Sequence, residues 1–418
     1  MFGAFPLDMS QYKSLFGGSR IPQKQKDWLY HCGDSKHFIV LRGGQIYAVD
    51  LFDKDGTIAP SEQIHACLST ILGEQSSCES ENCVGSLTSL GRDQWAEARS
   101  ELFAIGQNAV NLTLIDSALF AVCLDTEKSD DPRRLVQGLL VGDDASNRWF
   151  DKCFQLIVDA NGMATINFEH SWGDGVAVLR LMEESFRDAN RNHFVEPKQL
   201  FFADFTLSES LRQKIKDAQE KHIAVGSRLR IGTAEYFGMN RKFIKRSKLS
   251  PDSIMQLAVQ LAFYKLFNEF VPTYESCSTA AFLKGRTECV RSATCATRDA
   301  VLAVENGQGD LAELLKKCSA VHSQMIKEAA TELFNSDVYQ YMNRFVISTS
   351  TLATETVVLG GFGPVVSDGF GIAYNVVPAK MGAVILSYNG QRDATIFADA
   401  LLESLDILKN TIEKKLLI

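Results

Sequence analysis

The stretch FQLIVDANGMATINFEHSWGDGVAVLRLMEESF, residues 154–186, carries three structural signals in succession. Two runs of alternating apolar residues, Phe154–Asp159 and Met163–Phe168, are separated by a loop that contains Asn-Gly, which predicts a β-hairpin. From Val176 to Phe186 the apolar residues recur at helical spacing. A hairpin followed directly by a helix places the intervening Glu169–Gly175 on a tight corner at the end of a strand.

His170 lies on this corner, four residues before Asp174. An imidazole at a strand end, beside glycines, can take a proton from a hydroxyl or a thiol near neutral pH. A single histidine is more often a satisfied core or surface residue, but only His170 of the seven histidines follows an apolar strand and precedes two glycines with an acid close by. The pair could also supply two metal ligands from one helical face. Because no second cluster of possible ligands accompanies the pair, we expect no metal site. The pattern His-x-x-x-Asp-Gly is typical of CoA-dependent acyltransferases.

The composition sets limits on the class of protein. A chain of 418 residues, with 45% hydrophobic and 22% charged residues, is long enough for two large domains or three smaller ones. A net charge of −8 argues against a general nucleic-acid binder. The ten cysteines are scattered without a Cys-x-x-Cys pair, which indicates free thiols in a reducing compartment. The sequence has no apolar run long enough to span a bilayer, and Met1–Pro6 does not resemble a targeting peptide.

Outward from the quoted stretch, strands and helices alternate in both halves of the chain. A second hairpin is predicted from His37 to Leu51, and the polar composition of Gly73–Asp93 indicates a loop. Further helices are predicted at Ser208–His222, Ile254–Phe267 and Ile396–Leu416, and further strands at Val346–Thr351, Ile372–Val377 and Ala383–Tyr388. This alternation predicts an α/β fold with mixed sheets, with a first domain at residues 1–233 and a second at 234–418.

A basic run, Arg241–Lys248, directly precedes a helix start at Ser250-Pro251-Asp252. Serine suits the N-cap, proline the first turn and aspartate the positive end of the helix dipole. Five cations in eight residues next to a helix N-terminus could hold phosphate groups, or they could form a solvated basic loop.

Three other polar stretches could carry chemistry. Tyr274–Phe282 and Gly285–Glu288 could bind a small polar substrate or form a hydrogen-bonded turn. Ser348–Thr351 could supply oxyanion donors at a strand end or be ordinary edge-strand hydroxyls. The glycines of Gly360–Gly371 indicate tight turns or close backbone approach, and they do not fit a Walker loop or a dinucleotide fingerprint.

Together these stretches resemble the choline/carnitine acyltransferase family. The resembling segments follow the family's order and cover nearly the whole chain: Phe5–Tyr12, Asn147–Lys152, the His170 corner, Lys248–Asp252, Tyr274–Phe282, Gly285–Glu288, Ser348–Leu352 and Gly360–Gly371. The resemblance implies two chloramphenicol-acetyltransferase-like α/β domains with mixed sheets flanked by helices, with the active site between them. Relatives have a long N-terminal region before the equivalent of Met1, so the first domain is expected to be incomplete.

The activity implied is reversible transfer of a fatty acyl group between CoA and L-carnitine, in fatty-acid oxidation. His170 would be the general base for the carnitine hydroxyl or the CoA thiol, without an acyl-enzyme. Asp174 would orient the imidazole, and Ser350 would donate to the oxyanion and lie near carnitine. CoA is then a substrate, and no cofactor is expected.

The resemblance also assigns the binding residues. Tyr274, Ser276 and Thr287 match positions that hold carnitine, and Phe362 matches an aromatic ring beside its trimethylammonium group. Gly360 stands where short-chain relatives have a bulky residue that blocks an acyl tunnel, so a medium- or long-chain acyl group is expected. The CoA site would comprise Asn240, Arg241, Lys242, Lys245, Lys248, Ser250 and Asp252.

Within the CoA site, Lys245 is expected at the 3′-phosphate, and Arg241 replaces a usual lysine. Relatives further carry an Asp-Arg-His-Leu segment near Ala329–Glu332 whose arginine pairs with the carnitine carboxylate, and this chain lacks it. The alternative is therefore a catalytically impaired relative that binds acyl-CoA only, or a fragment that does not fold. By resemblance the protein would be mitochondrial, on the matrix side of the inner membrane, with peripheral membrane association and no nucleic-acid partner.

Overall fold

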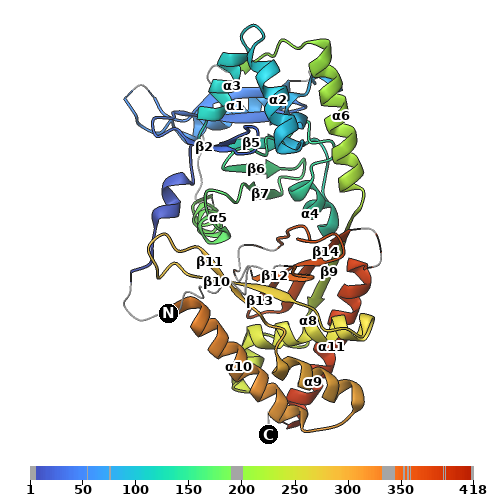
Figure 1. The fold of residues 1–418 in the computed structure, drawn as a ribbon. Coiled ribbons are helices and arrows are strands. Elements are labelled where there is room, and N and C mark those ends of the chain that lie inside the picture. Colours follow the sequence, from blue (N-terminus) through green and yellow to red (C-terminus); the bar gives the residue numbers. More distant parts are fainter. Residues whose placement is uncertain are drawn as a thin grey trace. The chain divides into compact units, whose positions relative to one another are not determined.

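The computed structural model describes residues 6–415 except 54, 75–76, 190–200, 332–343, 352–353, 355–356, 358, 389 and 391. The chain divides into two compact units (Figure 1). The first unit is Met9–Ser227, and the second is Arg228–Ile418 together with Met1–Asp8. The expected domain boundary at 233/234 falls inside strand β9 (Leu229–Tyr236), six residues after this division. Met1–Phe5, Leu352 and the start of the missing family segment at Glu332 lie outside the described residues.

A mixed six-stranded sheet in the order β7-β6-β5-β3-β4-β8 forms the centre of the first unit. Its strands are β3 (His37–Arg42), β4 (Gln45–Asp50), β5 (Ala121–Leu124), β6 (Phe154–Val158), β7 (Ala164–Phe168) and β8 (Phe201–Ala203). Strands β3, β5 and β6 run parallel to each other, whereas β3–β4, β6–β7 and β4–β8 are antiparallel. Both predicted hairpins are confirmed. Gly162 has a φ of +80°, a backbone conformation that glycine adopts without steric cost.

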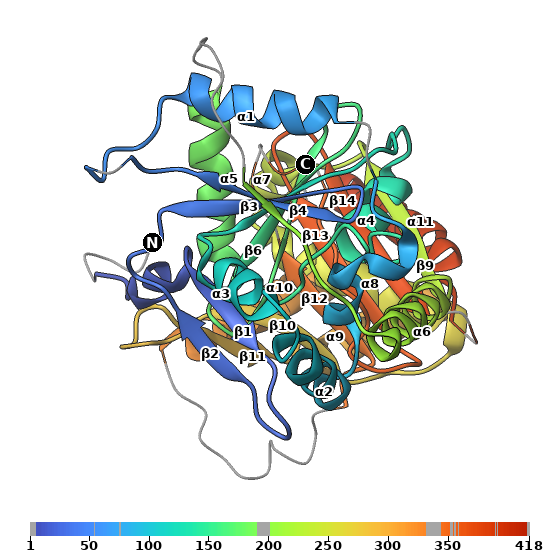
Figure 2. The same cartoon turned by 90° about the horizontal axis from the view of Figure 1, so that it is seen from above.

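Helices cover both faces of this sheet (Figure 2). Helices α1 (Ser61–Gly73) and α5 (Gly175–Ala189) lie on one face, where Phe38, Phe120 and Phe154 stack. The other face packs on α2 (Arg92–Phe103), α3 (Asn108–Ser117) and α6 (Glu209–Gly226). The unit is completed by η1 (Ser10–Ser14), β1 (Gly18–Ile21), β2 (Trp28–His31), η2 (Ser80–Asn82), η3 (Val84–Ser89) and α4 (Pro132–Leu140).

The interpretation of Gly73–Asp93 as a polar loop was wrong for its central part. Residues 84–88 are all buried within η3 and pack against α6. Gly85 lies so close to the carbonyl oxygen of Arg148 that an added Cβ would approach it to 2.5 Å. The glycine and serines in this part of the sequence indicate a loop. In the structure their small size instead allows the backbone of η3 to pack closely against neighbouring backbone.

The segment Asn147–Lys152, directly before β6, is a set of buried polar anchors. Arg148 donates two hydrogen bonds of 2.7 Å to the carboxylate of Asp125. Asp151 accepts hydrogen bonds from Trp95 and Arg92.

Lys152, the last residue of this segment, is buried as well. Burial lowers the pKa of Lys152 to about 8. Its three N–H groups lie within hydrogen-bond distance of four oxygens at the C-terminal end of α3: the Ser19 hydroxyl and the carbonyls of Ile115, Asp116 and Ala118. These contacts fix the start of the hairpin that leads to His170.

A second mixed six-stranded sheet, in the order β11-β10-β12-β13-β14-β9, forms the centre of the second unit. Its other strands are β10 (Thr273–Ser278), β11 (Thr287–Val290), β12 (Ile347–Thr351), β13 (Phe370–Val376) and β14 (Met381–Tyr388). Strand β12 lies between two parallel neighbours, so the interpretation of Ser348–Thr351 as edge-strand hydroxyls was wrong. The helices are α7 (Arg241–Arg246), α8 (Pro251–Phe267), α9 (Cys295–Asn306), α10 (Leu311–Thr331) and α11 (Ala394–Lys415).

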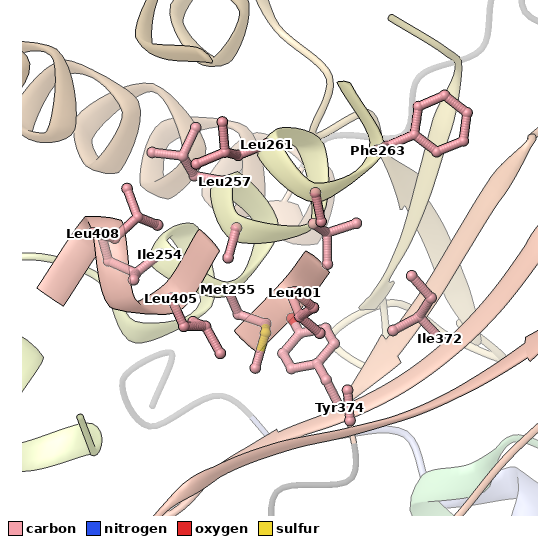
Figure 3. Packing of buried hydrophobic residues seen from close by; sticks show 14 of the residues in the cluster. Ile254, Met255, Leu257, Leu261, Phe263, Ile372, Tyr374, Leu401, Leu405 and Leu408 are labelled. Atoms are coloured by element: carbon pink, nitrogen blue, oxygen red, sulfur yellow. The ribbon is translucent and has the colours of Figure 1, made fainter. Parts of the chain in front are cut away.

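The main core of this unit lies between one face of the sheet and helices α8 and α11 (Figure 3). Every residue from Ile254 to Phe263 is buried, as the apolar composition predicted. The Ser250 hydroxyl caps α8 by accepting from the N–H of Ser253, with Pro251 in the first turn. Full burial of each large apolar side chain stabilises the fold by roughly 1.5–3 kcal/mol. The predicted α/β architecture with mixed sheets and flanking helices is thus confirmed, and no helix among the described residues has both the length and the apolarity to cross a bilayer.

Candidate active site

His170 lies on the turn between β7 and α5, as predicted. Its Nδ1 lies 3.5 Å from Oδ1 of Asp174. The imidazole is 64% exposed, whereas the carboxylate is buried. An accessible imidazole backed by a buried carboxylate can accept a proton from a bound substrate while the carboxylate stabilises the resulting cation.

The corner around this pair is held on both sides by residues distant in sequence. Glu169 accepts a hydrogen bond of 2.8 Å from Arg20 of β1 and another of 2.8 Å from the N–H of Ser171. The N–H of Asp174 donates to Oε1 of Gln11 at 2.7 Å, and the indole of Trp172 donates to the carbonyl of Cys153. These bonds fix the backbone of the corner and leave the imidazole exposed.

Three other histidines have structural hydrogen bonds. His37 and His222 each contact a backbone carbonyl oxygen through Nε2, and His322 is buried against Glu275. His193 lies outside the described residues. The interpretation as a satisfied core residue therefore fits the buried His322 and does not fit the exposed His170.

In the second unit, one face of the sheet collects the predicted hydroxyls. Thr273 and Thr349 bond to glutamines of α8, and Glu275 bonds to α10, so these side chains face the helices. Because side chains alternate along a strand, the opposite face carries Tyr274, Ser276 and Ser278 of β10 with Ser348 and Ser350 of β12. We call this set the serine face. The hydroxyl oxygens of Ser276 and Ser350 lie 3.4 Å apart, at a distance that permits both to contact one substrate oxygen.

The remaining predicted carnitine residues lie beside this face. Thr287 of β11 pairs with Ser278 and shares its side of the sheet. Phe362 lies over β13, because a Cβ on Gly371 would come within 2.3 Å of its carbonyl oxygen. Since Gly371 is the neighbour of Ser348 in the sheet, Phe362 lies next to the serine face.

Gly360 lines a pocket on the same side of the sheet. The pocket is formed chiefly by small or apolar residues of three strands and of the segment before Phe362: Ala234, Val357, Leu359, Gly360, Ala373, Gly382, Ala383 and Val384. Tyr374, Asn375, Glu235 and Lys380 also line it. The glycines and alanines make this part of the lining small, whereas Glu235, Asn375 and Lys380 make another part polar.

The basic run is not a loop. Its first six residues, Arg241–Arg246, form the short helix α7, which Asn240 caps by accepting from the N–H of Phe243, and Ser247 and Lys248 form the turn that follows. Arg241, Lys242, Lys245 and Lys248 are exposed. Ser250 caps α8, and Asp252 accepts a hydrogen bond from Tyr374 at 3.4 Å. The exposed cations are available to phosphates, whereas Asn240, Ser250 and Asp252 also have local structural roles.

The predicted site residues thus form two groups. His170 and Asp174 belong to the first unit, and all the others belong to the second, where Ser276 and Ser350 are in direct contact. Sequence reasoning missed the buried pair of Glu275 and His322, whose partners are 47 residues apart. The sequence did contain a signal for this pair. Glu275 lies between Tyr274 and Ser276, and because side chains alternate along a strand, its carboxylate must point to the opposite face, toward the helices.

Comparison with known proteins gives the class of this chain. The sequence model of the choline/carnitine O-acyltransferase family matches residues 1–332 and 330–403. Mitochondrial carnitine O-palmitoyltransferase 2 is 39% identical in Mus musculus and 38% in Homo sapiens, over 99% of this chain and 68% of the relative. Carnitine O-acetyltransferase of Mus musculus is 29% identical over 99% of this chain and 74% of the relative. The chain therefore belongs to the choline/carnitine O-acyltransferase family.

The family match is interrupted where the sequence predicted a missing segment. The two matched ranges meet at residues 330–332, at the end of α10. The alignments to the palmitoyltransferases extend over 453 residues, although the chain has 418, so they contain gaps in this chain. A solved structure, the epimerization domain from the third module of tyrocidine synthetase B, superposes with a TM-score of 0.38 at 12% identity, covering 71% of this chain and 81% of that chain.

Proposed function

We propose that this protein transfers a medium- or long-chain fatty acyl group reversibly between CoA and L-carnitine, as a carnitine O-acyltransferase of the palmitoyl type. The observation that carries the proposal is the accessible His170, backed by the buried Asp174, in a chain of this family. An accessible base is what acyl transfer to a hydroxyl requires, because an alcohol is a weak nucleophile at neutral pH.

His170 takes the proton of the carnitine hydroxyl while that oxygen attacks the thioester carbonyl of acyl-CoA. The tetrahedral intermediate collapses with breakage of the carbon–sulfur bond, and the departing sulfur receives the proton from His170. No acyl-enzyme forms, and the reverse reaction starts with the CoA thiol as the proton donor. Ser350 donates a hydrogen bond to the oxyanion. The contact with Ser276 helps to orient the Ser350 hydroxyl.

The second unit binds both substrates. Tyr274, Ser276 and Thr287 hold carnitine, chiefly its carboxylate, and Phe362 contacts its trimethylammonium group by cation–π attraction. The exposed cations Arg241, Lys242, Lys245 and Lys248 bind the phosphates of CoA, with Lys245 at the 3′-phosphate, and Asn240, Ser250 and Asp252 complete that site. By analogy with the relatives' names, the protein would work in mitochondria. A place at the matrix side of the inner membrane and a role in fatty-acid oxidation follow from the family resemblance of the sequence.

The acyl chain would enter the pocket that Gly360 lines. Gly360→Met is expected to lower kcat/KM for palmitoyl-CoA relative to acetyl-CoA by about 10- to 100-fold, because the added side chain fills space that only the long chain needs. The ratio of the two kcat/KM values measures the effect. Gly361→Met is the matched control, since Gly361 does not line the pocket, and an equal change of the ratio in both variants would contradict the assignment.

Thiol release from palmitoyl-CoA by the purified chain, with and without L-carnitine, tests the proposed function. Release that depends on carnitine is the expected result. The interrupted family match at residues 330–332 favours a second candidate, a relative that binds acyl-CoA without turnover. Palmitoyl-CoA binding measured by calorimetry, together with no carnitine-dependent release, would establish that candidate and reject the transferase.

A further inference from the structure

A chain of buried polar groups runs through the core of the second unit. His322 of α10 lies with Nε2 2.8 Å from Oε2 of Glu275 on β10. Oε1 of Glu275 accepts from the hydroxyl of Tyr374 at 3.4 Å, and that hydroxyl lies 3.4 Å from Oδ1 of Asp252 in the first turn of α8. Glu275 and His322 are buried, Tyr374 belongs to the apolar cluster between the sheet and the helices, and Asp252 is half-buried.

The hydrogen-bond directions in this chain follow from chemistry. Because a carboxylate can only accept hydrogen bonds, the contact with Glu275 requires the tautomer of His322 in which Nε2 carries a hydrogen and donates the hydrogen bond. Burial and the neighbouring carboxylates Glu275 and Asp252 raise the pKa of Tyr374 well above its ordinary value, so its hydroxyl remains a donor. Glu275 is 4% exposed and His322 is 6% exposed, so water has little access to replace either partner.

Glu275 lies between two residues of the serine face. Side chains alternate along β10, so Glu275 points toward α10 while Tyr274 and Ser276 point to the opposite side. These three residues share one short stretch of backbone, and a shift of Glu275 moves the other two. The hydrogen bond from His322 therefore fixes β10 from the side of the sheet opposite the serine face, to which we assign carnitine.

The neighbouring strand, β12, is also hydrogen-bonded to a helix on the side opposite the serine face. Thr349 of β12 accepts a hydrogen bond of 2.9 Å from Gln256 of α8 and donates one of 2.9 Å to the carbonyl of Tyr274. Gln256 in turn accepts from Ser292 at 2.8 Å. Both strands of the serine face are thus anchored to helices through buried hydrogen bonds, while Nδ1 of His322 has no hydrogen-bond partner among the described residues.

We propose that His322 is a positioning residue that, through its hydrogen bond to Glu275, holds β10 so that Tyr274 and Ser276 are aligned to bind carnitine. The inference rests on the proposed function, and it assigns His322 no contact with either substrate. Loss of this bond would leave a buried carboxylate with a single long hydrogen bond, and Glu275 would have to move toward water or acquire a proton.

The test compares His322→Leu with His322→Gln in the full chain. The leucine variant removes the donor and is expected to raise KM for L-carnitine by roughly 10- to 100-fold, because small misplacements of binding groups have effects of this size. The value of kcat at saturating carnitine should fall much less than KM rises, since the base is intact and the oxyanion donor Ser350 lies on β12, which keeps its own anchor to α8. The glutamine variant keeps an N–H donor in reach of Glu275 and should recover most of the lost affinity.

Leu315→Ala is the matched structural control. Leu315 lies on α10, is fully buried in the apolar cluster and makes no part of the polar chain. It should lower the melting temperature followed by circular dichroism and leave KM for carnitine unchanged. If His322→Leu changes only the melting temperature, or if His322→Gln fails to restore KM, His322 is a structural residue and the inference is wrong.

Calorimetric titration of L-carnitine onto the same variants separates this inference from the proposed function. Carnitine binding by the unmodified chain without turnover would reject the transferase, and the ratio of dissociation constants between the leucine and glutamine variants would still decide the role of His322. If the unmodified chain neither binds nor turns over carnitine, both proposals are rejected.

Discussion

His170→Ala is expected to lower carnitine-dependent thiol release from palmitoyl-CoA by about 10²- to 10⁴-fold, the usual contribution of a general base. The loss should appear in kcat, because the imidazole takes its proton during bond formation and not on binding. The melting temperature should stay the same, since the side chain is largely exposed. Initial rates with a thiol reagent, at saturating acyl-CoA and carnitine, give the measurement.

The matched control is His65→Ala, which removes an exposed histidine from α1 of the same unit. It should leave the rate unchanged. Asp174→Asn tests the partner carboxylate, and a smaller loss than that of His170→Ala is expected because the base itself remains. Retention of full activity by His170→Ala would refute the assignment of the base, whatever the other variants show.

The local parts of this fold could be predicted because their signals lie within a few residues. The Asn-Gly turn at residues 161–162 and the Ser-Pro-Asp start of α8 require only neighbouring atoms for their geometry. The corner that carries His170 was predicted for the same reason, since it is the short connection between two strongly patterned segments.

Contacts between distant segments could not be predicted in this way. Ser276 and Ser350 meet because β10 and β12 are parallel neighbours, and a parallel pair requires a long connection that leaves no local pattern. The burial of residues 84–88 depends on α6 and on the backbone near Arg148. Physical reasoning from the sequence picked out the polar stretches Tyr274–Phe282 and Ser348–Thr351, and the resemblance to a known family assigned roles to individual residues in them.

The segment Asn147–Lys152 was recognised in the sequence, but the roles of its side chains could not be predicted. The sequence analysis recognised it only as a shared motif, without a role for its side chains. In the structure, Arg148 is 1% exposed and donates to both carboxylate oxygens of Asp125 and to the carbonyl of Gly138. A charged motif next to the hairpin that leads to His170 can thus be an internal scaffold.

Arg148→Met is expected to destabilise the first unit by about 1–3 kcal/mol, because it removes both hydrogen bonds from the buried guanidinium to the partly exposed carboxylate of Asp125, which then keeps, among the described residues, only the bond from the Asn147 amide. All four tryptophans of the chain, Trp28, Trp95, Trp149 and Trp172, belong to this unit. Urea unfolding followed by tryptophan fluorescence therefore reports the stability of the first unit selectively.

Two further variants make the result specific to the pair. Arg134→Met removes an exposed arginine from α4 and should change stability by no more than about 0.5 kcal/mol. Adding Asp125→Asn to Arg148→Met removes the uncompensated charge and should recover part of the lost stability, so the two substitutions are expected to be non-additive. If Arg148→Met costs no more than Arg134→Met, the pair does not support the hairpin, and the position of His170 must depend instead on Gln11 and Arg20, which contact the corner from η1 and β1.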